Sequence, residues 1–212
     1  MPVKNIIFDL GGVLLDIDYS RTKLAMEKLG IGNFDEWYKQ TYSNPLFAQL
    51  EKGLIDSETF YTEFLRMTGI KRGVADLRLA WNAMLGGFLF DVPAVMQKLA
   101  RKYRLFLLSN TNEIHYHAFL QEFQERFGPQ DFNTLFEKAY FSHLLQQRKP
   151  DVEAFASVLH HSRLKAEETL FIDDTPINTE AAASLGIQVY TLQKGEDVVA
   201  ALESVTGMDL RG

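Results

Sequence analysis

The 212-residue chain contains no cysteine, which excludes disulfides, thiolate nucleophiles and Cys-ligated metals. This absence is compatible with a reducing compartment. Basic residues are fewer than acidic ones, with 22 Lys and Arg against 28 Asp and Glu, and the net charge is −6. Because nucleic-acid binding depends on clustered Lys and Arg, a nucleic acid is not expected as a partner.

Long hydrophobic runs, repeats and low-complexity tracts are missing as well. The first apolar stretch is broken at Asp9, so neither a signal peptide nor a membrane span is expected. The apolar share of 46% and the charged share of 24% are typical of a soluble globular protein. The length suits one ordinary domain, or a core domain with a smaller insertion. We therefore expect a cytoplasmic protein that is monomeric by default.

Short apolar runs alternate with longer helical patterns over most of the chain. Strands are predicted over residues 5–9, 104–109, 138–142, 169–173 and 187–191. Helices are predicted over residues 92–102, 112–127, 151–160, 177–185 and 196–205. This alternation is typical of right-handed crossovers between parallel strands. The sequence therefore predicts an α/β fold with a Rossmann-like three-layer core and a mainly parallel five-stranded sheet.

The segment after the first strand has helical periodicity and no convincing strand. Ser20 precedes one predicted helix, and Ser57 precedes another that ends near Gly69. A further helix is predicted over residues 74–85, where a pair of glycines would end it.

We therefore predict an inserted α-helical cap over residues 18–88, in a hydrolase core formed by residues 1–17 and 89–212. Residues 16–19 and 86–89 would be the two connections, with Gly86 and Gly87 as a candidate hinge. Aromatic residues are numerous enough to give the cap its own core: Phe34, Trp37, Tyr38, Tyr42, Phe47, Phe60, Tyr61, Phe64 and Trp81. Trp81 and Asn82, near the end of the last cap helix, are the first candidates for substrate contacts.

A carboxylate stands at the end of the first predicted strand. Asp9 follows the apolar run and precedes Gly11 by two positions. Ligands collect where the strands of a parallel sheet end, so Asp9 is predicted to face the site of chemistry. Alone this pattern is weak, because acidic residues followed by glycine occur in many turns.

A hydroxyl and an amide follow the second predicted strand. Ser109 and Asn110 come just before a predicted helix, whose free N–H groups favour an anion. Read alone, the segment is equally a plain turn in which Thr111 or Asn112 caps the helix.

Lys149 and a pair of carboxylates come later in the chain. Pro150 suits the first turn of the next helix and restricts Lys149 to an extended conformation. The ammonium could neutralise a carboxylate and a phosphoryl group together, or be a solvated surface charge. Asp173 and Asp174 end the fourth strand, and two adjacent carboxylates are costly unless a cation shares them. Mg²⁺ prefers such oxygen ligands, although Asp174 could instead cap the following helix.

Together, the four clusters resemble the haloacid dehalogenase superfamily of aspartate-nucleophile hydrolases. Its signature elements are matched in order by residues 8–13, 109–110, 149–150 and 173–174, so the resemblance covers nearly the whole chain. The inserted segment is similar to the helical cap of the type-one members. Residues 9–11 and 108–112 are most similar to a subgroup that contains a bacterial α-D-glucose-1-phosphate phosphatase. A sugar phosphate is therefore the leading candidate for the expected small phosphorylated substrate.

The resemblance implies a mechanism. Asp9 would attack the phosphorus of a phosphate monoester, and water would hydrolyse the resulting aspartyl-phosphate. Lys149 would pair with Asp9 and the phosphate, while Ser109 and Asn110 would bind the phosphoryl oxygens. Mg²⁺ would be held by the Asp9 side chain, the Gly11 carbonyl, Asp173 and Asp174.

Gly11 departs from the family pattern. Typical phosphatases of the superfamily carry a second aspartate there, which protonates the leaving alcohol, and such acid–base help is worth about 10²–10⁴-fold. Four residues are candidates to replace it: Asp16, Asp18, His115 and His117. The two histidines are more simply explained by a surface helix and the two aspartates by a polar linker, so the sequence assigns none of them.

Two other functions stay open. Superfamily members without the second aspartate include metal-independent 2-haloacid dehalogenases, in which the pair Asp173 and Asp174 would serve little purpose. A non-catalytic protein that binds a phosphorylated metabolite would not require a nucleophile such as Asp9. The function favoured by the sequence is Mg²⁺-dependent hydrolysis of a small phosphate monoester.

Overall fold

The computed structural model describes residues 1–32, 34–38 and 44–211. Its main sheet has five strands in the spatial order β5-β4-β1-β6-β7, and each neighbouring pair is parallel. The strands are β1 Asn5–Phe8, β4 Arg104–Ser109, β5 Lys138–Phe141, β6 Thr169–Asp173 and β7 Gln188–Thr191. The predicted α/β fold with a five-stranded parallel sheet is therefore confirmed.

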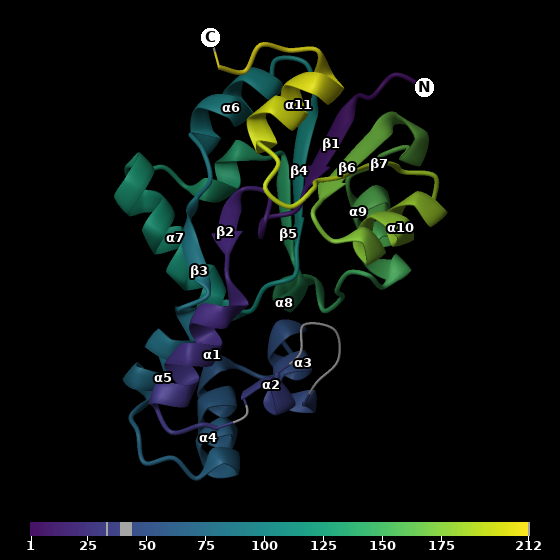
Figure 1. The fold of residues 1–212 in the computed structure, drawn as a ribbon. Coiled ribbons are helices and arrows are strands. Elements are labelled where there is room, and N and C mark those ends of the chain that lie inside the picture. The colour runs from purple at the N-terminus through teal and green to yellow at the C-terminus, as the bar shows by residue number, and fades with distance from the viewer. Residues whose placement is uncertain (33, 39–43, 212) are drawn as a thin grey trace.

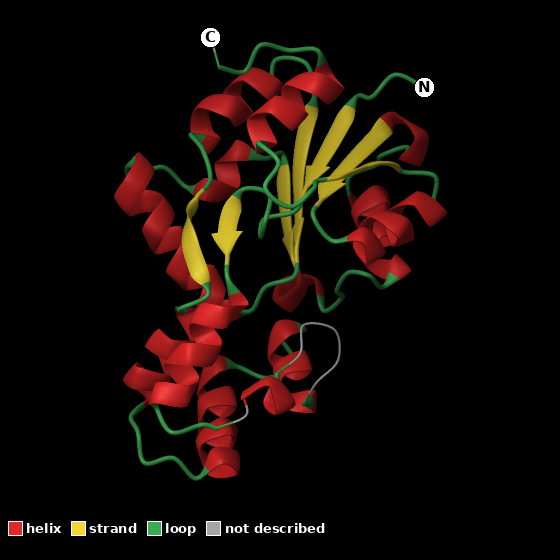
Figure 2. Ribbon diagram, in the orientation of Figure 1, coloured by secondary structure: helices red, strands yellow, loops and turns green. Residues whose placement is uncertain are grey.

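Helices cover both faces of this sheet (Figure 2). Because alternate residues of a strand face opposite sides, Ile6 and Phe8 pack on one face and Ile7 on the other. The first face packs against α6, α7 and α11, and the second packs against α9 and α10. These helices are α6 Val92–Leu99, α7 Glu113–Phe127, α9 Val152–His161, α10 Pro176–Ser184 and α11 Val198–Thr206. Short elements complete the core: η1 Phe132–Leu135, α8 Ser142–Leu145 and η2 Ala166–Glu168.

The core helices begin and end close to the predicted positions, with two corrections. The helix α6 ends at Leu99, three residues before the predicted end at residue 102. The helix α9 begins at Val152 with Asp151 as its N-cap, so Pro150 precedes the helix and does not lie in its first turn.

Among the described residues, five helices form a second lobe, which lies below the carboxyl ends of the strands in Figure 1. They are α1 Tyr19–Lys28, α2 Phe34–Trp37, α3 Pro45–Glu51, α4 Ser57–Thr68 and α5 Val74–Asn82, and we call them the cap helices. Most of the predicted aromatic residues pack in a hydrophobic cluster of their own: Phe34, Tyr38, Phe47, Phe60, Tyr61, Phe64 and Trp81. Tyr42 and the side chain of Trp37 lie outside the described part of the chain.

Aspartates, and not the predicted serines, cap two of these helices. Asp18 Oδ1 accepts a hydrogen bond from the backbone N–H of Ser20 at 2.9 Å, so Ser20 lies inside α1. Asp56 likewise caps α4, so Ser57 is the first helical residue. An ionised carboxylate accepts these bonds and also favours the positive end of the helix dipole. Gly69 ends α4 in a left-handed conformation, as predicted.

Two short strands connect the cap helices to the core (Figure 1). Strand β2, Leu15–Ile17, pairs antiparallel with β3, Leu85–Phe88. The prediction that residues 18–88 contain no strand is therefore wrong, and α5 ends at Asn82 and not at residue 85. Gly86 lies in β3, and a Cβ there would lie 2.3 Å from a carboxylate oxygen of Asp16, so any larger residue would require the Asp16 side chain to move. The two connections form one paired ribbon. Within the described ranges, no helix is long and apolar enough to cross a membrane.

Candidate active site

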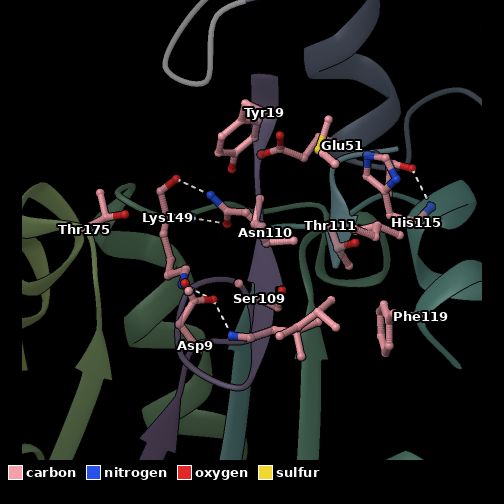
Figure 3. A pocket seen from close by; sticks show the side chains of 18 of the residues that line it. Asp9, Tyr19, Glu51, Ser109, Asn110, Thr111, His115, Phe119, Lys149 and Thr175 are labelled. Atoms are coloured by element: carbon pink, nitrogen blue, oxygen red, sulfur yellow. Dashed lines mark hydrogen bonds and ion pairs between the residues drawn. The ribbon is translucent and has the colours of Figure 1, made fainter. Parts of the chain in front are cut away.

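Three predicted residues meet at the carboxyl edge of the sheet. Asp9 directly follows β1, and Asp173 ends β6, which is the neighbour of β1 in the sheet. The Lys149 ammonium lies between them, 2.8 Å from Asp9 Oδ1 and 2.7 Å from Asp173 Oδ2. Figure 3 shows Lys149 directed toward Asp9.

Lys149 is buried as a charged side chain. Its side chain is 1% exposed and that of Asp173 is 0% exposed. Burial alone lowers the pKa of Lys149, but Asp173 and Asp9 oppose this effect, and the net pKa lies above its usual value. Lys149 therefore remains a cation, held by two carboxylates, and the alternative of a solvated surface charge is wrong.

The three predicted acidic ligands form one cluster. Oxygen atoms of Asp9, Asp173 and Asp174 lie within 4.8 Å of one another. Burial raises the pKa of Asp9 and the charge of Asp173 raises it further, while Lys149 opposes both effects. One ammonium does not balance the negative charge of three carboxylates. A divalent cation would balance the remainder. Hard oxygen donors of this kind fit Mg²⁺.

The carboxylate of Asp173 is fixed by donors that the sequence analysis missed. Asn178 Nδ2 donates to Asp173 Oδ2 at 3.0 Å, and the Thr175 N–H donates to Asp173 Oδ1 at 2.8 Å. Thr175, and not Asp174, is the N-cap of α10, so Asp174 is free of the capping role considered for it. Because α10 begins at Pro176, Asn178 lies in its first turn and faces back toward the end of β6. The short distance along the chain between Asp173 and Asn178 could therefore have indicated this contact.

Asn110 bonds to the backbone of Lys149. Its Nδ2 donates to the Lys149 carbonyl at 2.8 Å, and its Oδ1 accepts from the Lys149 N–H at 2.9 Å. Figure 3 shows both bonds. Ser109 is buried at the end of β4 and lines the cavity beside Asp9. Asn112 is the N-cap of α7, as the capping alternative predicts.

A cavity of about 150 Å³ opens above Asp9, between the sheet edge and the cap helices. Core residues lining it include Asp9, Gly11, Ser109, Asn110, Lys149 and Asp174. Cap residues lining it include Tyr19, Tyr38, Phe47, Glu51 and Trp81. Of the two predicted cap residues, Trp81 lines the cavity and Asn82 does not. The Oδ1 of Asn82 is instead 2.8 Å from His115 Nδ1.

Of the four candidates for the missing acid, His115 alone lines this cavity. Its ring stacks on Trp81 with 4.9 Å between centroids, and burial lowers its pKa to about 3, so it is neutral near pH 7. His117 is exposed on the same helix. Asp16 pairs with Arg21 at 3.2 Å, and Asp18 caps α1.

A second ion pair lies in the cavity wall and was not predicted. Glu51, the last residue of α3, places Oε1 2.9 Å from Arg148 Nε. Burial raises the pKa of Glu51, and Arg148 opposes this effect. No sequence pattern joins the two residues, because they come from distant segments of the chain.

Comparisons with known proteins agree with this geometry. The sequence matches the family model of the haloacid dehalogenase-like hydrolases over residues 3–186. One curated relative is D-ribitol-5-phosphate phosphatase from Bacteroides thetaiotaomicron, which is 29% identical over 196 residues, covering 92% of this chain and 94% of the relative.

Two solved structures are similar over nearly the whole chain. A wild-type haloacid dehalogenase (HAD) family enzyme from Bacteroides thetaiotaomicron, in complex with magnesium and inorganic phosphate, is 34% identical with a TM-score of 0.83, covering 92% of this chain and 96% of that one. A HAD-like family hydrolase from Porphyromonas gingivalis is 29% identical with a TM-score of 0.88, covering 99% and 100%.

Proposed function

Because the chain belongs to the haloacid dehalogenase-like hydrolases, we propose that it hydrolyses a small phosphate monoester through an aspartyl-phosphate on Asp9. The observation that carries this proposal is the buried cluster of Asp9, Lys149 and Asp173, with Asp174 beside it. A nucleophilic carboxylate, a fixed ammonium and two further carboxylates are what phosphoryl transfer to an aspartate requires.

The proposed reaction has two steps, and each residue of the site has a role in them. An Asp9 oxygen bonds to phosphorus while the bond from phosphorus to the alcohol oxygen breaks, and the leaving alkoxide takes a proton from water. Water then attacks the same phosphorus and releases phosphate, which regenerates Asp9. Asp9 Oδ1 accepts from the Leu10 N–H at 2.7 Å and pairs with Lys149, so the carboxylate is oriented before substrate binds. The Ser109 hydroxyl and the Asn110 backbone N–H would bind the phosphoryl oxygens, while Lys149 neutralises part of their charge.

Asp9, Asp173 and Asp174, together with the Gly11 carbonyl, would hold Mg²⁺. When bound, the ion supplies positive charge that lets one anion approach another. The magnesium and phosphate bound to the similar enzyme from Bacteroides thetaiotaomicron support this assignment.

A sugar or polyol phosphate is the substrate class that we propose, with the helices of residues 18–88 acting as the cap over it. The similarity to a D-ribitol-5-phosphate phosphatase supports this class, as does the resemblance to a glucose-1-phosphate phosphatase subgroup. The cavity wall also presents the charged pair of Glu51 from the cap and Arg148 from the core, which suits a hydroxylated leaving group better than a hydrocarbon one.

A screen of phosphate esters tests the proposal. We expect phosphate release from 4-nitrophenyl phosphate and from sugar or polyol phosphates with Mg²⁺, and none after chelation. Asp9→Asn should abolish turnover with the fold intact. Halide release from a 2-haloacid in the presence of chelator would identify a dehalogenase instead, and no turnover of any ester with metal would identify a binding protein.

A further inference from the structure

A charged pair, Glu51 of the cap helices and Arg148 of the core, lies beside the aromatic residues of the cavity wall. The aromatic residues of this wall are Tyr19, Tyr38, Phe47 and Trp81. The side chains of Glu51 and Arg148 lie among them and are only 19% and 13% exposed. A buried ion pair is no more stabilising than apolar residues of similar volume, so packing alone does not account for this one.

One oxygen of this pair lacks a hydrogen bond. Glu51 Oε1 is buried and accepts no hydrogen bond from any residue that the structure describes. Its 2.9 Å separation from Arg148 Nε is a charge contact without hydrogen-bond geometry. A buried acceptor without a donor is costly, so its presence in a cavity wall indicates a donor supplied by the ligand.

The position of Glu51 decides which part of the ligand supplies that donor. The phosphoryl group belongs at the floor, where Asp9, Lys149 and Ser109 lie. Figure 3 shows Glu51 beside Tyr19, at the end of the cavity away from Asp9. The leaving alcohol extends from the floor toward this end, so its substituents meet Glu51.

We propose that Glu51 accepts a hydrogen bond from a hydroxyl of the leaving alcohol, with Arg148 holding its carboxylate in place. This rests on the proposed phosphatase function and names the residue that selects the substrate class. The pair favours phosphates of polyols and sugars over phosphates of alkyl chains, because an alkyl chain leaves the buried carboxylate without a donor.

Three esters separate this role from the alternatives. D-ribitol 5-phosphate and n-pentyl phosphate have five-carbon primary alcohols as leaving groups, but only the first carries further hydroxyls. 4-nitrophenyl phosphate needs neither a hydroxyl contact nor a proton on its leaving group. We would measure kcat and KM for each ester with Mg²⁺, on the wild type, Glu51→Leu and Glu51→Gln. Glu58→Leu is the matched control, because Glu58 is an exposed glutamate of the same lobe.

The wild type should prefer D-ribitol 5-phosphate to n-pentyl phosphate by about 10-fold or more in kcat/KM. Glu51→Leu should lower kcat/KM for the ribitol ester by about 10- to 100-fold and leave the other two esters little changed. Glu51→Gln keeps an acceptor oxygen and should lose less than Glu51→Leu. Glu58→Leu should change none of the three.

Other patterns overturn the proposal. Equal losses on both alkyl esters with the aryl ester unchanged would make Glu51 a proton donor to the leaving group. Equal losses on all three would make its role structural, as would failure of both Glu51 variants to fold. A wild type without preference for the ribitol ester would also refute it. If the wild type cleaves none of the three esters, the phosphatase function itself fails, which is a different result.

Discussion

The side chain of Asn110 holds the backbone of Lys149 on both sides, through its Nδ2 at 2.8 Å and its Oδ1 at 2.9 Å. The ammonium of the same lysine lies between Asp9 and Asp173. Asn110 therefore fixes the starting point of the side chain whose charged end reaches the proposed nucleophile.

Replacing Asn110 should affect both stability and catalysis. Asn110→Ala removes two backbone hydrogen bonds, which should cost roughly 1–3 kcal/mol of unfolding free energy without substrate. A misplaced ammonium should lower kcat by about 10²-fold. Asn110→Asp keeps the acceptor for the Lys149 N–H but sets a carboxylate against the Lys149 carbonyl, so it should be the worse variant.

Urea unfolding without phosphate distinguishes this role from a contact made only with substrate. A residue that touches only the phosphoryl group would leave the stability of the free protein unchanged. An unchanged unfolding free energy in Asn110→Ala would therefore contradict the positioning role.

Gly11→Asp tests whether the missing acid limits the rate. The backbone of Gly11 is not left-handed, and an added Cβ would lie 3.0 Å from Ile17 Cγ1, so a side chain fits if Ile17 yields slightly. Turnover of alkyl phosphates should rise by about 10- to 100-fold relative to 4-nitrophenyl phosphate. Adding Ile17→Ala should increase the gain, because alanine lacks the Cγ1 atom that makes the contact.

Gly11→Ala is the control, because it brings the steric change without the acid. A uniform loss in Gly11→Asp that Gly11→Ala reproduces would show a packing defect. Unchanged turnover of all esters in Gly11→Asp would show that another group already supplies the proton.

Gly53 tests whether contact between cap and core is needed for turnover. It has a φ of +63°, and a Cβ there would lie 2.0 Å from the carbonyl oxygen of His143, a backbone atom of the core. Gly53→Ala should displace the cap from α8 and disturb the adjacent pair of Lys52 and Asp151, which are 3.4 Å apart. We expect a higher KM and a lower kcat for sugar and polyol phosphates.

Gly69→Ala is matched to this change, because Gly69 has a φ of +65° with nothing within 4 Å of an added Cβ. Both variants should lose roughly 1–2 kcal/mol of stability from the left-handed backbone. Only Gly53→Ala should lose activity. Equal kcat and KM in the two variants would show that the contact between residue 53 and His143 does not affect the active site.

The sequence predicted the core well because its signals are local. The core strands are short and mostly apolar segments that alternate with helices, and the carboxyl ends of parallel strands meet at one edge. Asp9 and Asp173 could therefore be placed together without a structure. The contact of Asn178 with Asp173 could also have been predicted, because Asn178 stands five positions after Asp173, on the first turn of the next helix.

The cap gave fewer such signals. Gly86 and Gly87 are typical of a helix end, yet they belong to a strand whose partner lies about seventy positions earlier in the chain. The contact between Glu51 and Arg148 also joins remote segments, and neither residue stands in a motif. Contacts of this kind depend on how the cap docks, which periodicity and spacing do not encode.

His115 provides a prediction about pH. Burial lowers its pKa to about 3, whereas an unfolded histidine titrates near 6.5. Between these values the unfolded chain binds the extra proton, so the stability contributed by neutral His115 is complete above pH 6.5 and is lost as the pH falls. From about pH 7.5 to about pH 5, the advantage of the wild type over His115→Gln should shrink by about 2 kcal/mol.

Urea unfolding at the two pH values measures this change, and His117→Gln is the control on the same helix, at an exposed position. This variant shows what replacing a histidine of α7 costs at a position that faces solvent, and the pH dependence of His115→Gln is compared with it. Since His115 is neutral throughout the working range, its replacement should also leave the shape of the pH profile of kcat unchanged. A kinetic limb that disappears in His115→Gln but not in His117→Gln would instead make His115 the group that replaces the acid missing at Gly11.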